Sequence, residues 1–103
     1  PLWLAPIQMR LLPITDAHLD YAKKLQQRLI SKNLRVECNT TNAKINYKIR
    51  EGILEKIPYL LIVGDKEMES DTVSARSRKK GDEGVVPVDD FINTVENEIR
   101  DRK

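Results

Sequence analysis

The sequence has one cysteine and one histidine, and this scarcity excludes several kinds of site. A single thiol, Cys38, cannot form an internal disulfide, and together with His18 it cannot complete a structural zinc site. No Ser/His/Asp or Cys/His catalytic set is recognisable either. We therefore expect no metal ligands and no catalytic residues. His18 is interpreted as an ordinary surface residue, and Cys38 as a small buried side chain at the end of a strand.

Glycine is also scarce, and the four glycines stand singly at positions 52, 64, 81 and 84. Neither a G-x-G-x-x-G stretch nor a Walker loop is present, which disfavours nucleotide binding in the usual phosphate cradles. No apolar run approaches the roughly 18 residues of a membrane span. Nothing near the first residue resembles a signal peptide. A cytoplasmic location away from membranes is expected.

The composition supports one ordinary domain of 103 residues, 40% of them apolar and 33% charged. The net charge is only +2, but nine basic residues lie against six acidic ones between Asn42 and Lys80. A local basic patch is expected rather than a strongly basic protein. Because the chain begins with Pro1, we expect it to be part of a longer protein. Residues 1–7 are predicted to be an incoming linker that packs on the domain, and residues 8–103 the domain itself.

The hydrophobic pattern predicts alternating strands and helices. Strands are expected at 8–14, 35–38, 59–63, 72–78 and 84–86, and helices beginning near 16, 42 and 89. The unbroken apolar run 59–63 predicts a strand buried on both faces, as in a sheet covered by helices. Residues 65–67 are expected to form a charged turn. This order predicts an α/β fold with a mixed sheet.

The second helix is interpreted as a basic amphipathic helix. Ile45, Ile49 and Ile53 are expected to face inward, with Asn42 at or near the helix cap. Gly52 is unfavourable within a helix and suggests close packing against a neighbour. The three basic residues of this helix are expected to project away from the core: Lys44, Lys48 and Arg50.

Four stretches carry a resemblance to a known family: W-L-A-P-I-Q at 3–8, N-x-K-x-x-Y-K-I-R at 42–50, K-I-P-Y-L-L-I-V-G-D-K-E at 56–67, and V-S-A-R-S-R at 73–78. In these stretches the chain closely resembles the C-terminal anticodon-binding domain of threonyl-tRNA synthetases. The resemblance covers nearly the whole chain. It implies an α/β fold in which a mixed sheet of about five strands is flanked by three helices.

The resemblance also implies partners and a parent activity. The parent would be a class II synthetase, typically a homodimer, whose upstream catalytic domain attaches threonine to tRNA with ATP, magnesium and zinc. This fragment would be non-catalytic and would use no cofactor. It would grip the anticodon loop of threonine tRNA and read its last two letters, guanine and uracil.

Carried over residue by residue, the family's anticodon contacts fall on Asn42, Arg50, Glu67 and Arg76. Arg76 offers a fork of donors that suits the O6 and N7 acceptors of guanine, and the Glu67 carboxylate suits a ring N–H donor. Unstacked loop bases expose such edges. Supporting contacts, chiefly to phosphates, are expected from Lys44, Tyr47, Arg78, Lys79 and Lys80.

Ordinary structural roles are the alternatives for the same residues. Arg76 could belong to the solvated face of an edge strand, Asn42 could be only a helix cap, and Glu67 could merely pair with a nearby lysine. Tyr47 is more often a packing residue. The chain also departs from the family before and within the second helix, where Thr40, Thr41 and Ala43 replace usually charged residues and Asn46 replaces a glycine.

A rival function is a protein-interaction or accessory domain that reuses this fold without reading RNA. A small-molecule-binding α/β domain is a weaker third possibility, disfavoured by the missing glycine loop. Grouping of Asn42, Arg50, Glu67 and Arg76 on one face would favour RNA recognition. Scattering of the four, or an apolar cover over that face, would favour the rival.

Overall fold

The apolar run 59–63 becomes the central strand, β3 (Tyr59–Val63), of a five-stranded sheet in the computed structural model, which describes residues 1–102. Strand β1 (Met9–Pro13) pairs parallel with β3, and β2 (Val36–Cys38) pairs parallel with β1 at one edge. On the other side β4 (Thr72–Ser77) and β5 (Gly81–Pro87) continue the sheet in antiparallel fashion. The order β2-β1-β3-β4-β5 confirms the expected mixed sheet.

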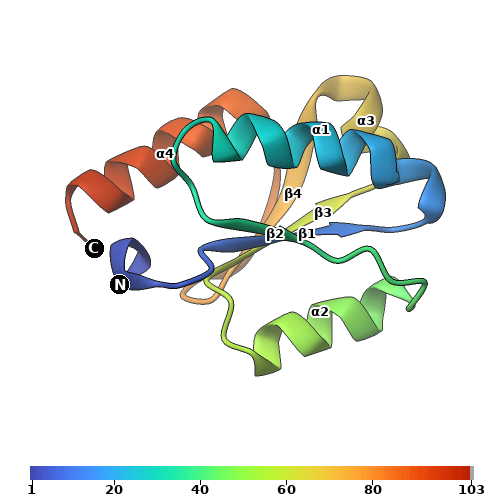
Figure 1. The fold of residues 1–103 in the computed structure, drawn as a ribbon, viewed down its shortest axis with the longest axis horizontal. Coiled ribbons are helices and arrows are strands. Elements are labelled where there is room, and N and C mark those ends of the chain that lie inside the picture. Colours follow the sequence, from blue (N-terminus) through green and yellow to red (C-terminus); the bar gives the residue numbers. More distant parts are fainter. Residues whose placement is uncertain (103) are drawn as a thin grey trace.

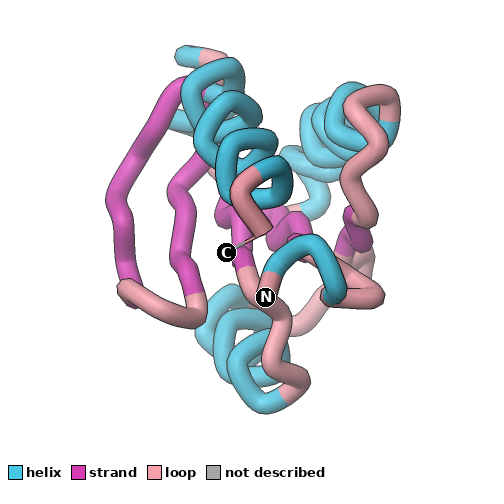
Figure 2. Tube along the Cα trace, turned by 90° about the vertical axis from the view of Figure 1, so that its left-hand side faces the viewer, coloured by secondary structure: helices cyan, strands magenta, loops and turns pink. Residues whose placement is uncertain are grey.

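Helices cover both faces of this sheet. Helix α1 (Leu19–Ile30) and helix α4 (Val88–Arg100) lie on one side, and α2 (Ile45–Leu54) lies on the other (Figure 1). The end-on view in Figure 2 shows the same separation into layers. Short 3-10 turns, η1 (Leu2–Leu4) and η2 (Asp16–His18), precede β1 and α1 respectively.

A fourth helix occupies the segment where a charged turn was expected, so that prediction was wrong. Helix α3 (Asp65–Ser70) joins β3 to β4. Gly64 is its N-cap, and the Glu67 carboxylate accepts a hydrogen bond from the Gly64 backbone N–H at 2.7 Å. Acidic residues in the first turn also suit the helix dipole. These local interactions favour the start of a helix after the strand ends.

Alternation along β1 and β3 divides the core into two clusters. Met9 and Leu11 join Leu61 in the larger cluster, which includes buried residues of α1 and α4. Leu12 and Leu60 lie in the smaller cluster, to which α2 contributes partly buried side chains. The central strand is therefore buried on both faces, as its unbroken apolar sequence predicted.

Helix α2 begins close to Asn42, as expected, and differs from the expectation toward its carboxyl end. Its N-cap is Lys44, so Asn42 precedes the helix and does not cap it. Ile45 and Ile49 pack toward the sheet as predicted. Ile53 was expected to face inward, but it is 62% exposed. The buried stripe instead continues through Gly52, one residue earlier.

The close packing predicted at Gly52 is confirmed. A Cβ atom added there would lie 2.5 Å from Cδ2 of Leu60, well inside van der Waals contact. Because Leu60 is itself buried in β3, the absence of a side chain at Gly52 allows the helix to approach the sheet closely. This contact sets the depth at which α2 lies.

The last strand is longer than predicted, beginning at Gly81 rather than Gly84. The β4–β5 register shifts between Ala75 and Arg76, so that Glu83 is an extra residue in β5. Gly81 and Gly84 have φ values of 76° and 80°, a left-handed conformation that glycine adopts readily. The irregularity hid the first part of this strand from period-two analysis, and it lies directly beside Arg76.

Candidate nucleic-acid interface

Arg76 lies on the inner strand β4, on the same face of the sheet as helix α2. Its cross-strand partner in β3 is Leu60, a residue of the smaller core cluster beneath that helix. Strand β5 covers the other flank of β4. Arg76 therefore does not belong to an edge strand, which was the structural alternative for this residue.

The guanidinium of Arg76 has unused donors. Its Nε atom is buried and has no hydrogen-bond partner among residues 1–102. Its Nη2 atom lies 3.8 Å from Oδ2 of Asp82, a long contact between half-exposed side chains that contributes little stability. An unsatisfied buried donor is uncommon in a native fold and calls for an explanation, such as a bound acceptor.

Asn42 lies in the loop between β2 and α2, and its side chain is exposed. The loop is shaped by Asn39 instead, whose Oδ1 accepts hydrogen bonds from the backbone N–H and the hydroxyl of Thr41. No hydrogen bond from the Asn42 side chain occurs within the described part of the chain. Its amide is therefore available to a partner molecule.

Glu67 follows the carboxyl end of β3 and is 7% exposed. Its Oε1 atom accepts the Gly64 N–H, and across residues 1–102 we find no salt bridge to this carboxylate. The suggested pairing with a nearby lysine is thus absent there. One oxygen stabilises the start of α3, and the other remains available as an acceptor.

Helix α2 presents three of the candidate residues to solvent: Lys44, Tyr47 and Arg50 are exposed, with Tyr47 at 58%. The alternative that Tyr47 is a packing residue does not hold in this structure. Lys48 was expected to project outward too, but it is 3% exposed, and its Nζ donates to the carbonyl of Pro13 at 2.9 Å. Spacing could have revealed this, because Lys48 stands between Ile45 and Gly52 in the buried stripe at intervals of three and four.

The four principal candidates are distributed over two adjoining regions. Asn42 and Glu67 follow the carboxyl ends of the parallel strands β2 and β3, whereas Arg50 and Arg76 belong to the α2 helix and the sheet face beside it. In the described chain no hydrogen bond or ion pair joins any two of them. A ligand would have to span them, which an extended strand of several nucleotides does.

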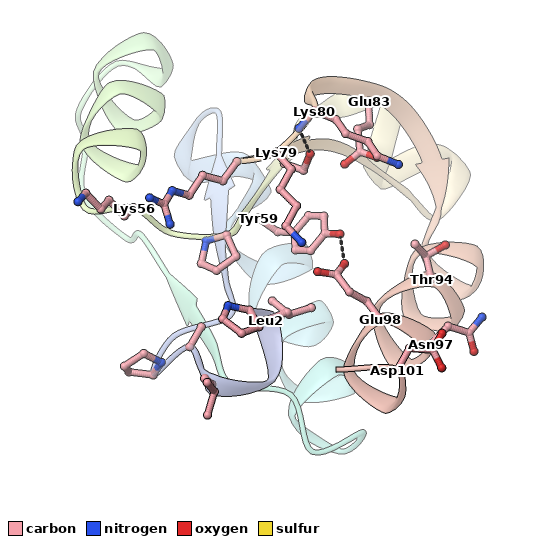
Figure 3. A pocket seen from close by; sticks show the side chains of 17 residues that line it. Leu2, Lys56, Tyr59, Lys79, Lys80, Glu83, Thr94, Asn97, Glu98 and Asp101 are labelled. Carbon is pink, nitrogen blue, oxygen red and sulfur yellow. Dashed lines mark hydrogen bonds between the residues drawn. The ribbon is translucent and has the colours of Figure 1, made fainter. Parts of the chain in front are cut away.

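A large cavity of about 770 Å³ lies at the amino end of β3, the end opposite to Asn42 and Glu67. Its walls come from five of the first six residues, the amino end of β3, the β4–β5 turn and helix α4 (Figure 3). None of the four principal candidates lines it, but three supporting ones do: Arg78, Lys79 and Lys80. Lys56 lines the cavity as well and adds a fourth cation.

Tyr59 lines this cavity, and both its hydroxyl and its ring make contacts within the protein. Its hydroxyl donates to Oε1 of Glu98 at 2.5 Å, and its ring meets Phe91 edge-on at 5.3 Å between centroids. Burial, followed by the nearby Glu98 carboxylate, raises the pKa of the phenol. Tyr59 is therefore a neutral structural hydroxyl and not a proton-transfer group.

His18 is a correction to the sequence-based interpretation, because it is buried at 4% exposure instead of lying on the surface. Its Nδ1 faces the backbone N–H of Thr15 at 3.2 Å, and its Nε2 lies 2.7 Å from Oδ1 of Asp65. The signal in the sequence is the three-residue spacing from Thr15 to His18 at a helix start, the spacing of a capping box.

The described residues were also compared with the requirements of a reactive thiol, a metal site and a membrane span. Cys38 is half-buried, and burial raises the pKa of its thiol, so it stays protonated near neutral pH. No group of three or more His, Cys, Asp or Glu side chains within residues 1–102 is arranged to hold a metal ion. Over the same range, no helix has the length and apolar character needed to cross a membrane.

Comparisons with known proteins agree on one family. The model described as "Anticodon binding domain" matches residues 6–98. A threonine–tRNA ligase of Clostridium botulinum (strain Loch Maree / Type A3) is 54% identical over 100 residues, and one of Desulforamulus reducens is 51% identical over 102. These matches cover 97% and 99% of this chain but only 16% of either relative.

A solved structure agrees with the sequence relatives. The RNA-binding domain of threonyl-tRNA synthetase from Cryptosporidium parvum Iowa II superimposes with a TM-score of 0.88 at 30% sequence identity. The alignment covers 94% of this chain and 24% of that one. The chain thus corresponds to a small part of the proteins that it resembles.

Proposed function

The chain belongs to the anticodon-binding domain family, and from this premise we propose that it reads the last two anticodon letters of threonine tRNA. The reading would involve Asn42, Arg50, Glu67 and Arg76. Such a function requires polar groups that lie on a rigid base, are left unpaired by the fold, and can reach unstacked bases.

The unpartnered Nε of Arg76 is the observation that carries the proposal. A guanidinium that is half-buried beside α2 has lost part of its hydration, so an acceptor that satisfies its donors would gain more than at an open surface. The guanine edge presents two adjacent acceptors, O6 and N7, that match the arginine fork. Asp82 holds the arginine only loosely, and a base can displace that contact.

Asn42 and Glu67 supply complementary groups at the neighbouring edge. The free amide of Asn42 can donate and accept, while the free oxygen of Glu67 can only accept. A uracil or guanine ring N–H is a suitable donor for that carboxylate. Because Glu67 is fixed by its bond to the Gly64 backbone, its free oxygen has one preferred position, which favours discrimination between bases.

The exposed basic residues serve a different purpose. Arg50 and Lys44 on α2, and the Arg78-Lys79-Lys80 turn beside the cavity, would contact phosphates and add affinity without letter choice. Tyr47 offers an exposed ring on which a loop base can stack. This division predicts that salt weakens binding to every loop equally.

The activity of a longer protein that contains this domain is part of the same proposal. Its relatives carry the name threonine–tRNA ligase, and this chain spans about 16% of their length. We infer that a catalytic domain elsewhere in the same chain attaches threonine with ATP, magnesium and zinc, in the cytoplasm and as a homodimer. The described residues would contribute only tRNA recognition.

Binding of the chain to a threonine tRNA anticodon stem-loop tests the proposal. Loops with guanine changed to adenine, or uracil to cytosine, in the last two letters should bind more weakly by about 1–3 kcal/mol per wrong letter. Arg76→Ala should abolish discrimination at one letter. Arg76→Lys, which keeps the charge but loses the fork, should do so too.

Arg100→Ala is the matched control, since it removes one arginine from the exposed end of α4 and should preserve discrimination. Equal binding of the wild-type chain to all loops would show a charged surface that does not read letters. No binding even at low salt would favour the rival function, a protein-interaction or accessory domain.

A further inference from the structure

His18 connects two segments that are far apart in the sequence. Its ring is buried between the turn that begins at Thr15 and the first turn of α3, where it meets Asp65, 47 positions later. Asp65 itself is largely exposed, with 81% of its side chain accessible. The position of the buried histidine is therefore fixed by its surroundings, whereas the position of the exposed Asp65 carboxylate is fixed mainly by its contact with His18.

The contacts define which ring nitrogen carries the proton. The backbone N–H of Thr15 can only donate, so Nδ1 must be the acceptor. In the neutral ring the hydrogen then resides on Nε2, which donates to Oδ1 of Asp65. The Thr15 N–H thus selects the tautomer that binds Asp65.

Helix α3 needs such external support. It has six residues, too few for a helix to be stable alone. Its first turn packs tightly against the segment before η2: a Cβ added to Gly64 would lie 2.6 Å from Cδ1 of Ile14. Asp65 and Glu67 lie in this same first turn, so the bond to His18 restrains the turn that carries Glu67.

We propose that His18 is a positioning residue for base reading: through Asp65 it fixes the first turn of α3 and thereby aims the free oxygen of Glu67. This inference rests on the proposed anticodon recognition, because Glu67 must be a reading residue for its aim to matter. His18 does not touch RNA in this scheme. Its effect appears as letter discrimination, not as overall affinity.

Two near-isosteric substitutions separate the two contacts of the ring. In His18→Gln the amide nitrogen occupies the region of Nε2 and can still donate to Asp65. In His18→Asn the side-chain oxygen takes the place of Nδ1 and can accept from Thr15, but nothing reaches Asp65. Asp65→Asn, which keeps an acceptor, and Asp65→Ala, which does not, form the matched pair on the other side.

The measurement is the affinity ratio between the threonine anticodon stem-loop and loops with one altered letter. Glu67→Gln first identifies the letter that Glu67 reads. At that letter His18→Asn and Asp65→Ala should reduce discrimination about three- to tenfold, while His18→Gln and Asp65→Asn stay close to wild type. In the His18→Asn/Glu67→Gln double variant the losses should not add.

The outcomes distinguish this inference from the proposed function. If wild type discriminates and Glu67→Gln does not, but all four variants keep full discrimination, His18 and Asp65 have no positioning role. The same conclusion follows if His18→Asn and His18→Gln lose discrimination equally in parallel with their free energies of unfolding. A wild-type chain without discrimination would overturn the proposed function and this inference together.

Discussion

At the scale of single residues, four of the five buried polar side chains among residues 1–102 have one role in common, Arg10 being the exception. Gln8, His18, Lys48 and Glu67 each bind a backbone group near the end of a strand or helix or in a connecting segment. Such groups lack a partner from regular secondary structure, and leaving them buried and unpaired is costly. These side chains therefore complete the backbone hydrogen bonding of the segments that connect the elements.

Lys48 provides the clearest test of this role. Lys48→Met keeps most of the stem but leaves the Pro13 carbonyl without its donor. We expect the free energy of unfolding to fall by about 1–3 kcal/mol, measured by urea denaturation. Lys44→Met, at the exposed N-cap of the same helix, should change it by less than about 0.5 kcal/mol. Equal stability of Lys48→Met and wild type would contradict the assigned role.

These buried polar residues also mark the limit of sequence analysis at this scale. Lys48 and Pro13 are 35 positions apart, and His18 and Asp65 are 47 apart. Residue type alone assigns a lysine or a lone histidine to the surface, because burial without a partner is unfavourable. Pro13 and Asp65 meet these side chains only after the sheet has formed, so spacing along the sequence could signal burial but could not identify these distant partners.

At the scale of elements, helix α2 is attached to the sheet by both apolar and ionic contacts. Below its carboxyl end Arg10 of β1 donates to both oxygens of Glu55 at 2.8 and 3.0 Å, and its Nε meets Glu37 of β2 at 2.5 Å. Arg10 is 7% exposed, so this paired charge is shielded from solvent. This group of Arg10, Glu37 and Glu55, called the clamp below, links two strands to the helix that carries Arg50.

The clamp predicts a pH dependence of stability. The hydrogen bond from Arg10 lowers the pKa of Glu55 below its usual value of 4.5. A carboxylate with a depressed pKa stabilises the folded state above the unfolded-state pKa, and this contribution is lost as pH falls through the folded-state pKa. The stability difference between wild type and Glu55→Gln should therefore be constant near neutral pH and shrink below about pH 4.5.

Urea denaturation of both proteins between neutral and strongly acidic pH provides the measurement. Glu51→Gln is the control, since no salt bridge involves Glu51 within residues 1–102. Its difference from wild type should not follow the Glu55 profile. A Glu55→Gln difference that stays constant down to the acid limit would show that the clamp does not stabilise the fold.

At this scale, an element could be predicted when its hydrophobic pattern was long enough to repeat. The five strands and three long helices could be predicted, because strand β3 repeats one apolar preference and α1 and α4 repeat a helical one. Helix α3 could not, since six residues contain less than two turns. The extent of β5 was also missed, because the bulge near Arg76 interrupts its alternation.

At the scale of the whole molecule, the first residues are part of the packed structure. Leu2 is buried in the main core cluster, and Arg35, before β2, donates to the carbonyls of Ala5 and Trp3 at 2.8 and 3.0 Å. Arg102 stacks over the Trp3 ring at 5.0 Å. Segment 1–7 therefore packs against the residue that precedes β2 and against the residue that follows α4.

Arg35→Ala should loosen this segment. We expect a red shift of tryptophan fluorescence, because Trp3 is the only tryptophan, and a loss of about 1–2 kcal/mol in the free energy of unfolding. Lys32→Ala, an exposed change nearby, should alter neither quantity. An unshifted emission maximum in Arg35→Ala would show that other contacts suffice to hold the segment.

The stacking of Arg102 on Trp3 brings the beginning and the end of the described chain side by side (Figure 1). A unit with neighbouring ends can be inserted at a single point of a host protein without forcing the host apart. Residues 1–8 precede the amino end of β1, while Asn42 and Glu67 follow the opposite ends of strands parallel to it. A host protein joined through these two ends would therefore lie at the amino end of β1, and Asn42 and Glu67 would lie at the opposite edge of the sheet, away from the host.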